Sequence, residues 1–159
     1  MRIGVISDTH IPRTARRLPE KIYKDFERVD MILHAGDLTE FELLNQLRKL
    51  APTTAVCGNM DDALVRSQLS PKEVIEIGKF KIGLIHGSGP PFGLMDRARK
   101  EFGKVDIIVY GHSHSPKNET HKEILFFNPG SPTDKIFTKH NTYGILEINN
   151  TVKGEIIRL

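Results

Sequence analysis

The segment Val105-Asp106-Ile107-Ile108-Val109-Tyr110-Gly111-His112-Ser113-His114 is the feature around which the rest of this chain is arranged. Its first six residues are mostly apolar and rich in β-branched side chains, and the run is too short for a typical helix. It therefore predicts a buried strand. Gly111 lets the backbone turn where the strand ends. Two imidazoles follow at positions i and i+2, which an extended backbone would place on one side of the chain. Such a pair indicates metal binding or proton transfer.

Four other predicted strands end in polar side chains of the same kind. Taken singly, each ending has an ordinary structural explanation, such as an Asx turn at Asp8 or an unusual backbone angle at Asn59. Five endings together indicate one shared site, because ligands gather at the carboxyl ends of strands in open α/β sheets. The four strands and their endings are Arg2–Ile6 with Ser7-Asp8-Thr9-His10, Asp30–Ala35 with Gly36-Asp37, Thr53–Cys57 with Gly58-Asn59, and Phe80–Ile85 with His86-Gly87.

The order of the predicted elements indicates the fold class. Strands alternate with helices early in the chain, which predicts parallel β-α-β units, whereas the later strands follow one another as hairpins. We expect an α/β protein, a four-layer αββα sandwich of two stacked mixed β-sheets flanked by helices, with the polar strand ends along one edge. The remaining expected elements are helices at Glu20–Val29, Glu40–Leu50 and Leu94–Phe102 and strands at Val74–Ile77, Ile124–Phe127, Thr142–Ile148 and Thr151–Ile157.

Several polar residues near these elements receive structural interpretations. Thr39 is predicted to cap the helix that follows it, with Glu42 as its capping-box partner. We expect Asp61 and Asp62 to cap the next turn, and His34, inside a strand, to be a core residue or to support the site. The turn Asn128-Pro129-Gly130-Ser131 is expected beside the same site.

Composition narrows the possible functions. A length of 159 residues indicates one domain over 1–159, and 38% hydrophobic with 27% charged residues is an ordinary globular balance. The single cysteine, Cys57, excludes an intramolecular disulfide and a thiolate metal site. No signal-peptide pattern or membrane-length apolar run is visible, so we expect a cytoplasmic protein with no membrane partner. With only 7% aromatic residues and no Trp, we expect no stable nucleic-acid partner.

The donors at the strand ends are too numerous for one ordinary divalent ion. Two ions that share one carboxylate would use two carboxylates, one amide and four imidazoles. Nitrogen and oxygen ligands without thiolate suit transition metals, with Mn²⁺ our first choice and Ni²⁺, Fe²⁺ or Zn²⁺ as alternatives, whereas Ca²⁺ and Mg²⁺ suit so many imidazoles poorly. The expected metal ligands are Asp8, His10, Asp37, Asn59, His86, His112 and His114.

Two such ions predict phosphoester hydrolysis. Ions about 3.5–4 Å apart hold a hydroxide between them and clamp phosphate oxygens. Phosphoryl transfer depends mainly on positioning and charge stabilisation, which a pair of ions supplies without a protein nucleophile. The expected substrate is a small phosphodiester or phosphomonoester. The net charge of +3 is compatible with an anionic substrate, although a solvated basic surface is the simpler explanation.

The five ordered motifs resemble those of the calcineurin-like metallophosphoesterases, and the short chain with its Asn128–Ser131 turn is similar to the small YfcE-like phosphodiesterase branch. The resemblance extends from the first strand to the last hairpin. It implies that one metal is held by Asp8, His10, Asp37 and His114. Asp37 then bridges to a second metal, whose other ligands are Asn59, His86 and His112. It also implies catalytic roles for Asp37, His10 and His86.

One position departs from the larger members of that family. They carry His directly after the motif Asn, where it protonates the leaving group or steadies the transition state, whereas this chain has Met60. The small branch commonly lacks that His as well, so Met60 does not argue against catalysis. The leading interpretation is a metal-dependent phosphodiesterase. Such a protein could form a homo-oligomer. The alternative is a non-catalytic protein-binding module of the same fold, as in a retromer subunit, and the complete ligand set in this chain favours the enzyme.

Overall fold

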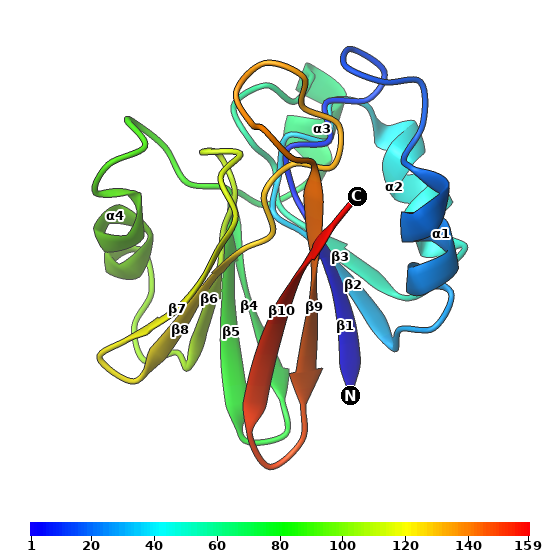
Figure 1. The fold of residues 1–159 in the computed structure, drawn as a ribbon. Helices are drawn as coiled ribbons and strands as arrows, with labels where there is room; N and C mark the ends of the chain where they lie inside the picture. Colours follow the sequence, from blue (N-terminus) through cyan, green and yellow to red (C-terminus); the bar gives the residue numbers. More distant parts are fainter.

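The structure, a computed structural model, describes residues 1–159 and stacks two five-stranded mixed sheets against each other (Figure 1). The strand orders are β10-β9-β1-β2-β3 and β4-β5-β6-β8-β7. The first sheet consists of β1 (Arg2–Ile6), β2 (Met31–His34), β3 (Thr53–Ala55), β9 (Thr142–Ile148) and β10 (Val152–Arg158). The second consists of β4 (Lys72–Ile77), β5 (Phe80–Ile85), β6 (Ile107–Val109), β7 (Lys117–His121) and β8 (Ile124–Asn128). The helices are α1 (Glu20–Phe26), α2 (Phe41–Arg48), α3 (Ala63–Gln68) and α4 (Leu94–Lys100).

The core between the sheets follows from the alternation of side chains along the strands. In β1, Ile3 and Val5 face the second sheet and pack in one cluster with Ile107 and Val109 of β6. The next residue after Val5, Ile6, belongs to the cluster on the opposite face. Because a shift of one residue would move each apolar side chain to the wrong face, this alternation fixes the register of the central strands.

Helices cover the two outer faces and complete the four layers. Helices α1 and α2 pack their apolar stripes, including Phe26 and Leu44, on the first sheet, and α4 packs Leu94 and Ala98 on the second (Figure 1). Gly4 permits the close approach of α1, since a Cβ at this position would lie 2.6 Å from Cε1 of Phe26. The predicted αββα fold class is confirmed.

Parallel pairing brings the polar strand ends to one edge. Strands β1, β2 and β3 run parallel in the first sheet, and β5, β6 and β8 run parallel in the second. Strands β9, β10, β4 and β7 are antiparallel to their neighbours. The loop after β1 (blue) and the loop before β9 (orange) lie at the same end of the molecule in Figure 1. No helix is both long and apolar enough to cross a membrane.

Several local predictions were wrong. Thr39 does not cap α2: its φ is +85°, Glu40 occupies the cap position, and no side chain caps the helix. Asp62 caps α3 by accepting a hydrogen bond from the backbone nitrogen of Val65, as predicted. The carboxylate of Asp61 instead accepts hydrogen bonds from backbone nitrogens outside α3. Strand β7 was missed because its residues are polar and exposed, and pairing with β8 forms it. The predicted helices end too late by two or three residues, because the apolar residues Val29, Leu50 and Phe102 continue each pattern beyond the observed helix end.

Candidate metal centre

All seven predicted ligands lie at the edge where the parallel strands end. They come from the loops that follow β1, β2, β3, β5 and β6, so both sheets contribute. Most of these side chains are buried, with Asp8 0% and Asp37 2% exposed. A buried carboxylate requires compensation by hydrogen bonds or opposite charge, which the facing imidazoles supply.

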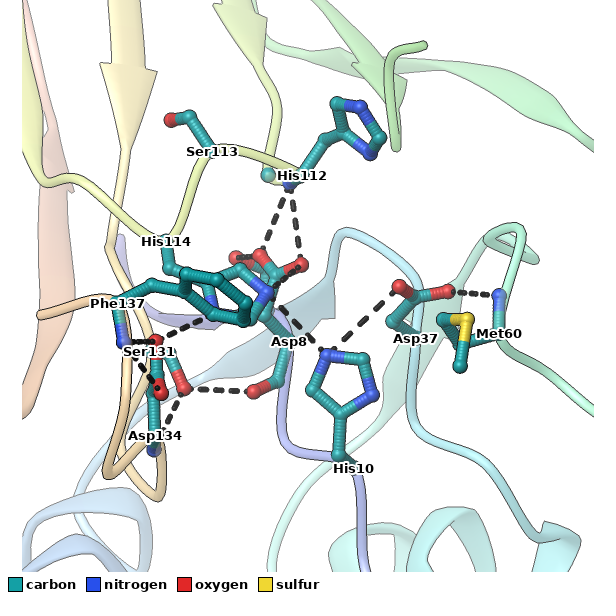
Figure 2. A network of polar contacts seen from close by, with 12 residues as sticks. Asp8, His10, Asp37, Met60, His112, Ser113, His114, Ser131, Asp134 and Phe137 are labelled. Atoms are coloured by element: carbon teal, nitrogen blue, oxygen red, sulfur yellow. Dashed lines mark hydrogen bonds and ion pairs between the residues drawn. The ribbon is translucent and has the colours of Figure 1, made fainter. Parts of the chain in front are cut away.

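The backbone at this edge is not extended. Asp8, His10, Asp37, His112 and His114 all have positive φ, between 45° and 69°. Residues other than glycine seldom adopt this region, and such conformations concentrate at functional sites. The prediction that His112 and His114 share one side of an extended chain was therefore wrong. His112 and His114 point in different directions and join different groups of donors (Figure 2).

The first group of donors surrounds Asp8. Nε2 of His114 lies 3.3 Å from Oδ1 of Asp8 and 3.3 Å from Nε2 of His10. Nε2 of His10 is also 3.8 Å from Oδ2 of Asp37 (Figure 2). Asp8, His10 and His114 each offer one ligand atom within a space that suits a metal ion.

The second group surrounds Asn59. Oδ1 of Asn59 lies 3.2 Å from Nε2 of His86 and 3.2 Å from Nδ1 of His112. Nε2 of His86 lies 3.2 Å from Oδ2 of Asp37 and 3.9 Å from Oδ1 of Asp8. Asp8, Asp37 and His86 form a second possible metal-binding set. Both carboxylates therefore lie between the two groups of imidazoles.

Each of these carboxylates directs one oxygen to the imidazoles, and its second oxygen accepts hydrogen bonds from protein donors; the backbone nitrogen of His112 also lies 3.2 Å from Oδ1 of Asp8. Oδ2 of Asp8 accepts from Oγ of Ser7 at 2.6 Å and from the backbone nitrogen of His112 at 3.0 Å. Oδ1 of Asp37 accepts from the backbone nitrogen of Met60 at 2.7 Å (Figure 2). These bonds fix the orientation of both groups before any ligand binds.

The imidazoles and carboxylates shift one another's pKa. Burial alone would lower the pKa of His86 and of His114, but the facing carboxylates, mainly Asp37 for His86 and Asp8 for His114, raise both to about 9. Burial opposes ionisation of Asp8 and Asp37, yet hydrogen bonds from His114 and His86 hold the pKa of each carboxyl below its usual value. Burial lowers the pKa of His10. Protons on the imidazoles thus balance the negative charge of the carboxylates, and a bound metal ion can replace those protons.

Other residues position the predicted ligands. His34 is fully buried, its Nε2 lies 3.0 Å from Oγ1 of Thr9, and burial lowers its pKa to about 3, which agrees with the predicted supporting role. Oγ of Ser131 donates to the carbonyl of Asp8 at 2.7 Å, so the predicted turn does lie beside the site. Asp61 is not a helix cap. Its carboxylate accepts from the backbone nitrogens of Asp37, Thr39 and Gly58 and joins two ligand loops.

Asp134 is a functional candidate that the sequence did not indicate. Its Oδ2 lies 2.6 Å from Nδ1 of His114, on the side of the ring away from the cluster. Asp134 stands in a loop with no regular pattern before β9, so no local signal distinguishes it from a surface carboxylate. A carboxylate on the second nitrogen of a histidine is the usual support for a metal ligand.

A cavity of about 660 Å³ opens over the cluster. Its floor includes His10, Asp37, Asn59, His112 and His114, and its rim combines cationic and apolar side chains. The rim residues are Arg13, Met60, Lys135, Ile136 and Phe137.

The donor set fits divalent transition metals. It offers imidazole nitrogens and carboxylate and amide oxygens, and the one cysteine is not among the groups that could hold an ion. This mixture suits Mn²⁺, Fe²⁺, Ni²⁺ or Zn²⁺ better than Ca²⁺ or Mg²⁺.

Known proteins resemble this chain in sequence and in fold. A probable metallophosphoesterase of Methanothermobacter thermautotrophicus is 39% identical, covering 99% of this chain and 92% of that protein. A probable metallophosphoesterase of Methanocaldococcus jannaschii is 45% identical over 84% of this chain and 69% of its own length. A phosphodiesterase of the same organism is 28% identical over 99% of both proteins.

Solved structures include enzymes and other proteins. A novel archaeal phosphodiesterase superposes with a TM-score of 0.79 at 26% identity and covers 100% of both chains. Vps29 of Entamoeba histolytica in complex with Zn²⁺ has a TM-score of 0.78 at 30% identity and covers 99% of both chains. The sequence model of the calcineurin-like phosphoesterase superfamily domain matches residues 1–151. This chain therefore belongs to the calcineurin-like phosphoesterase superfamily.

Proposed function

We propose that this protein is a metal-dependent phosphodiesterase that hydrolyses a P–O bond of a small phosphodiester at a site for two metal ions. The observation that supports it best is the convergence of seven donor residues from five strand ends, with the carboxylates of Asp8 and Asp37 between the imidazoles. The relatives named as phosphodiesterases support the same class of reaction.

The ligand assignment follows the two groups of donors. Asp8, His10 and His114, with Asp37, would hold one ion, and Asn59, His86 and His112, again with Asp37, would hold the other. Asp37 is suited to the shared position because its Oδ2 lies 3.2 Å from His86 and 3.8 Å from His10. Asp8 also lies near both groups. When bound, the ions would supply an activated water as nucleophile and positive charge against the phosphate oxygens.

The chain itself positions the substrate. The cavity over the cluster is open to a phosphate, and Arg13 and Lys135 on its rim provide positive charge for an anionic ester. The proposed catalytic residues are His10, Asp37 and His86, because Oδ2 of Asp37 faces one imidazole from each of the two donor groups. Their positions are held by the buried backbone and side-chain contacts of the ligand loops, so little reorganisation is needed on substrate binding.

The leaving group receives no proton from the residue after Asn59. Met60 occupies this position and is 44% exposed on the rim, and its thioether has no proton to donate. We propose that water or another group of the site protonates the leaving oxygen, so that esters of acidic alcohols and phenols react fastest. Rates for diesters of phenols with different pKa test this. A flat dependence, with chemistry limiting the rate, would refute it.

The direct test compares bis(p-nitrophenyl) phosphate with p-nitrophenyl phosphate as substrates. Metal-free protein is supplied with Mn²⁺, Ni²⁺, Zn²⁺ or Mg²⁺, and Asp37→Ala is assayed beside Asp96→Asn, which changes an exposed carboxylate on α4. We expect metal-restored diesterase activity that Asp37→Ala loses and Asp96→Asn retains. Absence of activity in folded protein with demonstrated metal occupancy would contradict the proposal.

A non-catalytic protein-binding module is the second candidate. The observation that favours it is the close structural similarity to Vps29 chains of Entamoeba histolytica, one of them described in complex with Zn²⁺. Metal binding alone therefore does not distinguish an enzyme from a binding module. Activity that depends on the metal and on Asp37 would exclude the purely non-catalytic alternative.

A further inference from the structure

The rim of the cavity over the metal centre carries apolar side chains that the fold leaves exposed. Ile136 is 82% and Phe137 76% exposed, and Met60 is 44% exposed. All three line the same cavity. Phe137 and Met60 lie on opposite sides of the donor cluster (Figure 2). The phosphate site therefore has an apolar wall on each side.

The wall formed by Ile136 and Phe137 is held in place by hydrogen bonds. Oδ1 of Asp134 accepts from the backbone nitrogen of Ile136 at 2.7 Å and from that of Phe137 at 3.1 Å. The side-chain amide of Asn141 donates to the carbonyl of Asp134 at 2.7 Å. The ring of Phe137 stands edge-on to His114, with 5.6 Å between ring centroids and an interplanar angle of 83°. An exposed aromatic ring is thus fixed directly against a predicted metal ligand.

Two cations stand on the same rim. Arg13 and Lys135 line the cavity, and neither is among the ion pairs of the structure. Their charge is therefore free to attract an anion. A ligand complementary to these cationic and apolar rim residues carries negative charge at its centre and a flat apolar group beside it.

We propose that Ile136 and Phe137 form a subsite for an aromatic substituent of the phosphodiester, an aryl group or a nucleobase, and that Met60 contacts the other ester substituent. This proposal rests on the proposed function, because it names the substrate class of that same site. A diester, with organic groups on both sides of phosphorus, uses both apolar walls, whereas a monoester uses one. The geometry therefore favours aromatic phosphodiesters over dialkyl diesters and monoesters.

A substrate series with one leaving group tests the subsite. Methyl, phenyl and thymidine 5′ diesters of p-nitrophenyl phosphate share the same leaving phenol and differ in the second substituent. The metal-loaded wild type should have a higher kcat/KM for the phenyl and thymidine diesters than for the methyl diester. Phe137→Ala should reduce this preference about 3–10-fold, the size expected of one aromatic contact. The relative effects on the phenyl and thymidine esters identify whether the subsite suits an aryl group or a nucleobase.

Matched variants provide the controls. Phe137→Tyr retains the ring and should retain the preference. Phe92→Ala removes a phenylalanine that is 80% exposed but does not line this cavity, and should leave the preference unchanged. An unchanged preference in Phe137→Ala, or an equal loss in Phe92→Ala, would overturn the subsite while diester hydrolysis itself persists.

A binding measurement separates the subsite from catalysis. Diphenyl phosphate and dimethyl phosphate are titrated calorimetrically into metal-loaded wild type and Phe137→Ala. We expect diphenyl phosphate to bind more tightly and to lose about 3–10-fold in affinity in Phe137→Ala. If no diester is hydrolysed but this difference persists, the proposed function fails and the subsite stands. If the two phosphates bind equally, the subsite is refuted whatever the activity.

Discussion

Oδ2 of Asp134 lies 2.6 Å from Nδ1 of His114, while Nε2 of the same ring lies 3.3 Å from Oδ1 of Asp8. One nitrogen of His114 is therefore bound by a supporting carboxylate, and the other is directed at the donor cluster. Asp134 is 5% exposed, and its second oxygen accepts two backbone hydrogen bonds. The loop before β9 thus orients a side chain that belongs to the loop after β6.

Removal of the Asp134 carboxylate should weaken metal binding. We expect Asp134→Ala to lower the affinity for Mn²⁺ or Zn²⁺ about 10–100-fold, and Asp134→Asn to lower it less, because an amide oxygen still accepts from Nδ1–H of His114. Competition of the metal-free protein with a chromophoric chelator measures this affinity. Asp96→Asn, on the surface of α4, is the control with the same loss of charge. Wild-type affinity in Asp134→Ala would contradict the supporting role.

Metal binding should release protons. His86 and His114 have pKa values of about 9 in the metal-free protein, so both are protonated at pH 7. A histidine must lose its proton to bind a metal ion, and we expect about two protons to be released when both sites fill at pH 7. Apparent affinity should then rise with pH up to about 9. Calorimetry in two buffers of different ionisation enthalpy counts the protons, and zero release would refute the prediction.

The same raised pKa values make the stability of the metal-free protein depend on pH. The pKa of each imidazole rises from 6.5 to about 9 on folding, so the folded state binds these protons more tightly than the unfolded state does. Their stabilisation is fully present below pH 6.5 and is lost as the pH rises through about 9. Between pH 6.5 and about 9, the Tm of the metal-free wild type should fall more than the Tm of metal-free His86→Gln. Equal pH profiles for the two proteins would contradict the assignment for His86.

Gly58 should not tolerate a side chain. A Cβ at this position would overlap Oδ1 of Asp37 and lie 2.6 Å from the backbone nitrogen of Asp37. Gly58→Ala should therefore displace the carboxylate of Asp37, a proposed metal ligand, and destabilise the protein by about 1–3 kcal/mol. Gly103→Ala is the matched control, because nothing lies within 4 Å of its Cβ, and we expect a change within about 0.5 kcal/mol. Metal titration and urea unfolding measure both effects, and unimpaired metal binding by Gly58→Ala would count against this packing.

The contact between the sheets should depend on Phe127. This residue of β8 is 0% exposed and packs in the cluster that joins the two sheets. Phe127→Ala should lower the free energy of unfolding by about 3–5 kcal/mol, because a large cavity remains in the core. Phe92→Ala, at an exposed position, should change it by about 0.5 kcal/mol or less. Equal losses in the two variants, measured by urea unfolding, would show that the inter-sheet core is not the source of the stability.

Patterns local in the chain were sufficient to predict the layers and most strands. The segments Arg2–Ile6 and Thr142–Ile148 show the two-residue periodicity of strands, and the segment between β1 and β2 shows the 3.6-residue periodicity of a helix. Both patterns can be read from residues that are close together in the sequence. Strand β7 has no such pattern, since its residues are polar, and it exists because β8 pairs with it. Thr39 has the residue type of a cap, but its backbone is bound by Asp61 in a conformation that excludes capping.

The chemical types at the strand ends were likewise evident from the residues alone, since Asp8, Asp37 and the histidines each follow an apolar run. Tertiary structure decided which of them meet. His112 joins Asn59 and His114 joins Asp8, although only one residue separates the two histidines in the sequence, because both have left-handed backbone conformations. The contacts of Asp134 and Phe137 with His114 also depend on how the loop before β9 folds over the sheet edge. Such contacts depend on loop dihedral angles and on the stacking of two sheets, which no local periodicity encodes.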